Sequence, residues 1–111
     1  MTEQVEYKDF EKLDIRIGTV KEVNPHPNAD KLYVLKIQFD KEPDRQIIAG
    51  IKNYYKPEEI LGKQVAVIVN LKPATLRGVE SNGMLLAADN DEGKVVVLTP
   101  EKKIDNFSKI Y

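Results

Sequence analysis

Four basic side chains of this sequence stand where they are able to neutralise the phosphates of a nucleic acid. Lys31 ends a loop rich in asparagine and proline, and Lys52 follows a short apolar run. Lys72 and Arg77 belong to a second polar loop, which contains two glycines. Cations that replace counterions on phosphates make affinity fall steeply with salt. The pattern indicates salt-dependent binding of a polyanion, and the alternative is that all four are ordinary solvated surface charges.

Three polar side chains in the same two loops are candidates to hydrogen bond to sugars or base edges. They are Asn28, Ser81 and Asn82, although each of these residue types is equally common in turns. Met84 follows them, either as an adaptable apolar contact surface or as filler at the start of an apolar strand.

Aromatic rings accept unpaired bases by stacking, which contributes roughly 1–3 kcal/mol per base. The candidate rings are Tyr33, Tyr54 and Tyr55. Tyr33 shares its parity with Leu35 and Ile37, so the pattern predicts a core position for it. Tyr54 and Tyr55 stay open as stacking surfaces.

The sequence offers no set of residues for catalysis or metal binding. Ser81 lies between Gly78 and Gly83, but a nucleophile elbow is Gly-x-Ser-x-Gly, and here the first glycine comes one residue too early. There is no cysteine, and the single histidine, His26, stands between two prolines and is predicted to be a rigid, exposed loop residue. We therefore expect a non-catalytic protein with no metal and no other cofactor.

Composition is typical of a soluble globular protein. The 111 residues suffice for one domain, with 41% hydrophobic and 32% charged residues. We see no signal peptide or membrane-spanning run, so we expect a cytoplasmic protein that does not bind a membrane. The net charge of −1 excludes attraction to a polyanion by the overall field. Local clusters remain, because residues 52–77 hold five basic and two acidic residues (+3), whereas residues 89–92 carry −3.

Alternating apolar residues predict short strands on either side of the two loops. The expected strands cover residues 13–23, 32–39, 46–49, 64–70, 84–88 and 94–98. The apolar side of the first strand changes parity near Gly18, which we interpret as a β-bulge. Residues 56–62 predict a short helix, with Pro57 in its first turn. Residues 5–12 predict one or two helical turns, and the apolar groups of residues 99–111 predict packing, for example on a second copy.

Regularly spaced short strands indicate an all-β fold. Five principal strands, with a short helix between the third and the fourth, suit a five-stranded oligonucleotide/oligosaccharide-binding (OB) Greek-key barrel with short helices and an extra C-terminal strand. In that barrel the loops between strands 1 and 2 and between strands 4 and 5 flank the binding face. These loops are residues 24–31 and 71–83, so the barrel predicts that Lys31, Lys72 and Arg77, together with Lys52 after the third strand, converge on one groove.

Four ordered motifs closely resemble the stand-alone tRNA-binding domain family, which includes the C-terminal extension or separate beta subunit of methionyl-tRNA synthetase. The motifs are Lys12–Gly18, His26–Leu32, Asn70–Pro73 and Leu76–Ala88. The resemblance covers nearly the whole chain and implies an OB-fold domain at residues 13–111, after an N-terminal extension or short helix at residues 1–12. It also implies a protein, commonly a homodimer, that recognises tRNA by its shape and raises the substrate concentration for a synthetase.

Carried over by position, the resemblance implies a tRNA-binding groove at Asn28, Lys31, Arg77, Ser81, Asn82 and Met84. Lys52 and Lys72 are added on electrostatic grounds. The expected partners are tRNA, a second copy of the chain and methionyl-tRNA synthetase. Family members often continue with longer C-terminal segments that build the dimer, whereas this sequence ends at Tyr111. A second, similar branch comprises small dimeric export-related chaperones, so the alternative function is binding of unfolded peptide.

Overall fold

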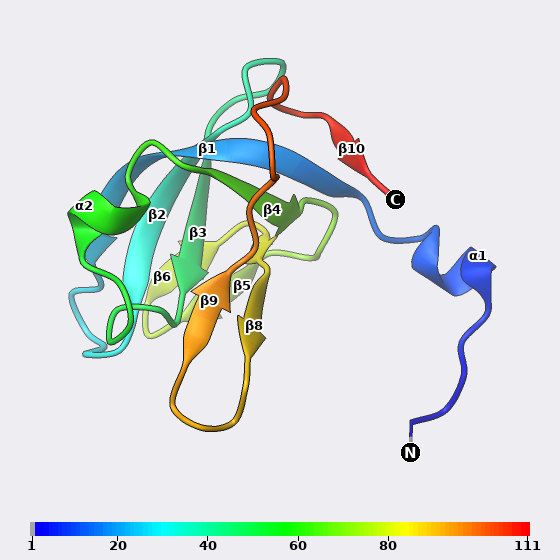
Figure 1. Cartoon of the computed structure of the whole chain (residues 1–111). Coiled ribbons are helices and arrows are strands. Elements are labelled where there is room, and N and C mark those ends of the chain that lie inside the picture. Colours follow the sequence, from blue (N-terminus) through cyan, green and yellow to red (C-terminus); the bar gives the residue numbers. More distant parts are fainter. Residues whose placement is uncertain (1) are drawn as a thin grey trace.

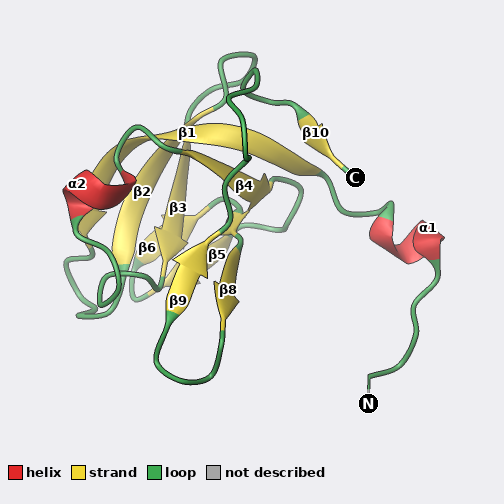
Figure 2. Ribbon diagram, in the orientation of Figure 1, coloured by secondary structure: helices red, strands yellow, loops and turns green. Residues whose placement is uncertain are grey.

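The computed structural model describes residues 2–111, and one curved antiparallel sheet forms its centre (Figures 1 and 2). The strands of this sheet are β1 (Ile15–Pro25), β2 (Tyr33–Gln38), β3 (Arg45–Ala49), β4 (Gln64–Ile68), β7 (Met84–Leu85) and β10 (Lys109–Ile110). Their spatial order is β3-β2-β1-β4-β7, and β10 pairs with β1. The sheet curls until β3 comes close to β7, which nearly closes a barrel. This confirms the all-β prediction and is consistent with an OB-like barrel.

The interior of this barrel is filled by branched and aromatic side chains. The fully buried ones are Val20, Leu35, Ile37, Phe39, Ile47, Ile60, Val65 and Val67. Tyr33 is 4% exposed, which confirms its predicted core position. Ile60 comes from α2 (Pro57–Ile60), the predicted short helix, and the Glu59 carboxylate caps this helix by accepting a hydrogen bond from the Lys56 backbone N–H at 2.6 Å.

The predicted bulge near Gly18 is wrong in position. The register of β1 against β2 shifts between Val20 and Glu22, so Lys21 is the extra residue. The parity change arises because β1 is covered on both faces: Ile17 contacts the C-terminal segment outside the barrel, whereas Val20 belongs to the core. Gly18 is needed for close approach, since a Cβ atom there would lie 2.5 Å from the Ile37 side chain.

The predicted strand at residues 84–88 is divided between two sheets. β7 pairs with β4, whereas β8 (Ala87–Asp89) pairs with β9 (Val95–Val97) in a separate hairpin. The Leu86 N–H still donates to the Ala66 carbonyl at 3.0 Å, so the chain leaves the barrel only after this residue. The three residues of β8 are exposed, and so is Met84, so only Leu85 is buried in the apolar run that the sequence suggested to be buried.

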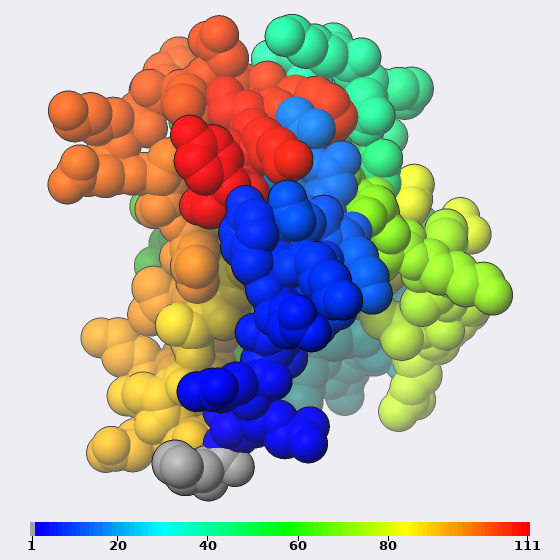
Figure 3. Space-filling model, turned by 90° about the vertical axis from the view of Figure 1, so that its right-hand side faces the viewer, coloured from blue at the N-terminus to red at the C-terminus, as the bar shows by residue number. Residues whose placement is uncertain are grey.

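The N-terminal segment and the C-terminal segment lie beside each other on one face of the molecule (Figure 3). The helix α1 (Tyr7–Phe10) confirms the predicted one or two helical turns before β1 and is four residues long. The C-terminal segment packs on its own barrel, with Ile110 paired to Ile15 and the Phe107 ring edge-on to Phe39 at 6.0 Å between centroids. Within residues 2–111, neither helix has the length and apolarity that crossing a membrane requires.

Candidate nucleic-acid interface

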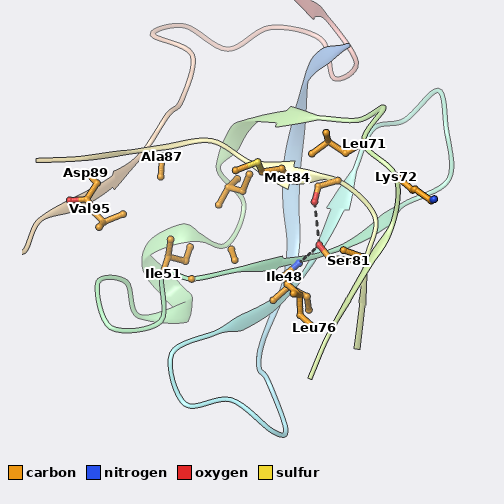
Figure 4. Close-up of a pocket in the computed structure, with 15 residues that line it drawn as sticks. Ile48, Ile51, Leu71, Lys72, Leu76, Ser81, Met84, Ala87, Asp89 and Val95 are labelled. Carbon is orange, nitrogen blue, oxygen red and sulfur yellow. Dashed lines mark hydrogen bonds between the residues drawn. The ribbon is translucent and has the colours of Figure 1, made fainter. Parts of the chain in front are cut away.

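An apolar groove of about 440 Å³ opens beside β3, between the chain that follows β4 and the β8–β9 hairpin (Figure 4). Its apolar walls are formed mainly by Ile48, Ile51, Leu71, Leu76, Met84 and Val95. Figure 4 shows Asp89 at one end of this groove and Lys72 at the other, with the Lys72 ammonium directed outward. The groove therefore offers apolar contacts at its centre and charges of opposite sign at its ends.

A hairpin within the predicted loop at residues 71–83 separates this apolar groove from a second depression. The hairpin consists of β5 (Ala74–Leu76) and β6 (Val79–Ser81). Its two turn residues, Arg77 and Gly78, have φ of 52° and 86°, as a type I′ turn requires. Arg77 adopts the left-handed backbone conformation, which costs a non-glycine residue about 1–3 kcal/mol. Because Arg77 is a turn residue, it lies at the tip of the hairpin.

The second depression is a cationic cleft of about 470 Å³, lined by residues 28–32 and Arg77. It brings together Asn28, Lys31 and Arg77 from loops that lie about fifty positions apart, as predicted for Lys31 and Arg77. The predicted convergence is wrong for Lys52 and Lys72, which do not line this cleft. The cleft also contains Asp30, which lowers the local positive charge. Leu76 lines the apolar groove and its neighbour Arg77 lines the cationic cleft, so the two depressions adjoin at the hairpin tip.

The eight predicted site residues do not all line the same depression. Lys72, Ser81 and Met84 line the apolar groove, with Met84 51% exposed. Lys52 is half-buried, follows the groove residue Ile51, and lines neither depression among the described residues. For all eight residues, contact with tRNA stays a prediction.

Ser81 is the predicted site residue whose surroundings differ most from an open binding position. It is 6% exposed, and its hydroxyl accepts a hydrogen bond from the Ile48 N–H at 2.9 Å and donates one to the Gly83 carbonyl at 3.2 Å (Figure 4). The hydroxyl therefore uses both its donor and an acceptor site within the protein. Its evident role is to join β6 to β3.

Asn82 continues this seam between β3 and β6. Its backbone N–H donates to the Gln46 carbonyl at 2.8 Å, and the Gln46 side-chain amide donates to the Glu80 carbonyl at 2.8 Å. The Arg45 guanidinium donates to the Val69 carbonyl at 2.5 Å and more weakly to the Asn82 carbonyl at 3.5 Å. Sequence reasoning missed Arg45 and Gln46, because no local pattern at the start of β3 shows that these two side chains hydrogen bond to the chain between Val69 and Asn82.

The prediction that His26 is exposed is wrong. The side chain is 5% exposed, and its Nε2 lies 2.9 Å from the Leu76 carbonyl oxygen, while Nδ1 accepts a hydrogen bond from the Asn28 N–H at 2.9 Å. Burial arises because the β5–β6 hairpin docks on the β1–β2 loop, a contact that the flanking prolines alone do not reveal. Asn28 strengthens the contact, since its side-chain amide donates to the Arg77 carbonyl at 3.0 Å.

Of the three tyrosines considered for base stacking, two serve the core. The Tyr33 hydroxyl donates to the Tyr55 carbonyl at 2.7 Å, and the Tyr55 hydroxyl accepts from the Val97 N–H at 3.0 Å. Tyr54 is 44% exposed and is the remaining candidate. Among residues 2–111, no three His, Asp or Glu side chains are arranged to hold a metal ion.

Comparison with known proteins places this geometry in a family. Residues 15–109 match the family model described as a putative tRNA binding domain. The chain is 53% identical to a methionine–tRNA ligase of Pyrococcus horikoshii over 108 residues, which are 97% of this chain and 15% of that enzyme. The chain therefore spans only about a seventh of the length of the curated relatives that it matches.

Two solved structures resemble the whole chain. A MetRS-related protein from Pyrococcus horikoshii superposes with a TM-score of 0.92 at 33% identity, covering 99% of this chain and 100% of that one. The chaperone CsaA from Bacillus anthracis superposes with a TM-score of 0.88 at 32% identity, covering 98% of this chain and 100% of that one.

Proposed function

Because the chain belongs to the putative tRNA binding domain family, we propose that it is a non-catalytic protein that binds tRNA by its shape and backbone. The observation that carries the proposal is the cationic cleft, in which Lys31 and Arg77 from two distant loops face one depression. Phosphates of the tRNA backbone lie in this cleft. Sugars and exposed base edges contact the adjoining apolar groove.

The proposed cellular role is that of an accessory or beta subunit to methionyl-tRNA synthetase in the cytoplasm. Support comes from the likeness to a segment of methionine–tRNA ligase and to a MetRS-related protein. A module that holds tRNA next to a synthetase raises the effective concentration of the substrate, and needs no catalytic residue of its own. Co-purification with the synthetase from the native cell extract tests this role, and its absence from the extract's synthetase fraction contradicts it.

Titration of labelled tRNA at several salt concentrations tests the binding proposal. We assume that Lys31, Lys52, Lys72 and Arg77 each neutralise one phosphate. The logarithm of the association constant then falls against the logarithm of the salt concentration with a slope of roughly −0.7 to −0.9 per contact. Binding is therefore expected to be about 50- to 150-fold weaker at 200 mM than at 50 mM salt. Binding that does not depend on salt contradicts a phosphate-led interface.

Single alanine substitutions test the cationic cleft itself. Lys31→Ala and Arg77→Ala each remove one phosphate contact, so the salt slope becomes shallower by roughly 0.7–0.9 and different tRNAs are weakened alike. Lys102→Ala is the matched control, because Lys102 is exposed on the segment between β9 and β10, away from both depressions. Equal affinities for all three variants and the wild type refute the cleft as the binding surface.

The apolar groove favours a second function, namely binding of unfolded peptide as a chaperone. Met84 and Leu76 are both substantially exposed at its edge, and the chaperone CsaA shares the fold. Competition separates the two functions: an unfolded polypeptide that displaces labelled tRNA supports a shared groove. A polypeptide that does not bind, while tRNA does, eliminates the chaperone function.

We also propose that the protein is a homodimer, joined through an outer groove of about 370 Å³. This groove is lined almost entirely by apolar groups, including Ile17, Ala66, Leu86, Leu98, Ile104 and Ile110. Figure 3 shows the N-terminal segment beside the C-terminal segment on one face of the molecule. The N-terminal and C-terminal segments carry further exposed apolar groups, among them Tyr7 at 68% and Tyr111 at 92% exposure. Large exposed apolar patches mark interaction sites.

The dimer proposal predicts that Ile104→Glu turns the protein into a monomer. Ile104 is 50% exposed at the outer groove, so a carboxylate there does not disturb the core but must be desolvated in the dimer. Light scattering or sedimentation measures the mass, with Lys102→Gln as an exposed control that changes the charge by the same amount outside the outer groove. A wild-type mass equal to one chain at all concentrations contradicts the dimer.

A further inference from the structure

The ring of His26 links two loops that are fifty positions apart. Its Nδ1 is bound within its own loop, to the Asn28 N–H, and its Nε2 is bound to the Leu76 carbonyl on the β5–β6 hairpin, each at 2.9 Å. One nitrogen therefore serves the local turn and the other serves the contact between loops. This division makes the two roles separable by experiment.

The partners of the ring define its protonation. A backbone N–H is only a donor, so Nδ1 must carry the lone pair and Nε2 the proton. A carbonyl oxygen is only an acceptor, which is consistent with an Nε2–H donating to Leu76. The neutral ring is thus fully satisfied in this arrangement, as a 5% exposed side chain requires.

The base of the β5–β6 hairpin is joined to β3 through Ser81 and Glu80, whereas its tip is held by the β1–β2 loop. All three residues of β5 are exposed, as are Arg77 and Gly78 in the turn. The two successive carbonyls at the tip, those of Leu76 and Arg77, accept hydrogen bonds from His26 and from the Asn28 side chain. The direction of the Arg77 side chain toward the cleft therefore depends on the β1–β2 loop.

We propose that His26 is a positioning residue for tRNA, because its Nε2–H holds the β5–β6 hairpin in the orientation that places Arg77 opposite Lys31. The inference rests on the proposed tRNA function and adds to it a residue that does not itself contact the ligand. When the bond between loops is lost, the hairpin samples other orientations, and apparent affinity falls with the population of the competent one.

Two substitutions separate the bond between loops from the bond within the loop. Glutamine places an amide N–H near the position of Nε2, so His26→Gln retains a donor for Leu76 and loses the acceptor for Asn28. Asparagine places an amide oxygen near the position of Nδ1, so His26→Asn retains the local turn and loses the bond to Leu76. If His26 only stabilised the fold, there would be no reason for His26→Gln to bind tRNA more tightly than His26→Asn.

The experiment titrates unfractionated tRNA into the full chain at one low salt concentration, with thermal unfolding recorded for each variant. His26→Asn is expected to weaken binding about three- to tenfold, the factor that one net hydrogen bond supplies, and His26→Gln at most about twofold. Amide spectra should show the Arg77 and Gly78 resonances shifted and broadened in His26→Asn only. Equal affinities for the two variants, or tighter binding by His26→Asn, overturn the proposal.

An Arg77→Ala arm distinguishes this failure from failure of the tRNA function. If Arg77→Ala weakens binding and His26→Asn does not, only the positioning role is refuted. If the wild type itself does not bind tRNA, both proposals fall. Should either histidine variant not fold, long-range ¹H–¹⁵N spectra of the wild-type ring decide: a proton on Nε2 supports the bond to Leu76, and a proton on Nδ1 overturns it.

Discussion

Replacement of Ser81 by alanine is the sharpest test of the seam between β3 and β6. The substitution leaves the buried Ile48 N–H without the acceptor that it has at 2.9 Å. An unsatisfied buried donor costs about 1–3 kcal/mol in unfolding free energy. With an unfolding entropy of about 2.1 cal/mol/K per residue, a chain of this length loses roughly 4 °C of melting temperature per kcal/mol. We therefore expect Ser81→Ala to melt about 4–13 °C below the wild type.

Thermal unfolding followed by circular dichroism measures this difference, and urea titration checks that the m-value is unchanged. Ser108→Ala is the matched control, since its hydroxyl bonds to the Asp105 carbonyl at an exposed site. Its expected effect is within about 0.5 kcal/mol. Equal melting temperatures for the two variants would falsify the structural role of Ser81. If Ser81→Ala instead loses tRNA affinity at full stability, Ser81 is a direct contact after all.

Two further substitutions test the core. Gly18→Ala places a methyl group 2.5 Å from Ile37 and 2.7 Å from Phe39, so we expect overpacking to lower the unfolding free energy by about 1–3 kcal/mol in urea titration; unchanged stability contradicts the close approach. Tyr33→Phe removes the bond to the Tyr55 carbonyl, with an expected cost of about 0.5–1.5 kcal/mol. Its tRNA affinity should equal that of the wild type, and a marked loss would restore Tyr33 as a stacking surface.

The sequence carries the general layout of the barrel and its two loops. Alternation of apolar residues marked β2 correctly, including the core position of Tyr33, and proline with acidic residues marked α2. These signals are local, because each depends on residues that are neighbours along one strand or helix. The approach of Lys31 to Arg77 followed once the strands were ordered, since the barrel brings their loops together.

Features that depend on contacts between distant segments were not predictable in this way. The hairpin inside residues 71–83 is short, and its Arg77 turn position lacks the usual Asn-Gly signature. His26 is buried by a hairpin fifty residues away, and Ser81 is buried because its hydroxyl replaces a strand partner of Ile48. The parity change near Gly18 predicts a bulge there, because sequence alone does not show that both faces of β1 are covered. In each case a partner outside the local pattern decides the environment.

The pairing of β1 with β10 has a consequence for how the chain reaches its native state. Ile15 and Ile110 are 95 positions apart, whereas Ile37 and Arg45 of the β2–β3 pair are separated by eight. Bringing the more distant pair together costs about 2 kcal/mol more chain entropy. We expect the β2–β3 hairpin to form early and β10 to dock last. Until it docks, the opening residues of β1 present unpaired N–H and C=O groups, which favour aggregation in a crowded refolding mixture.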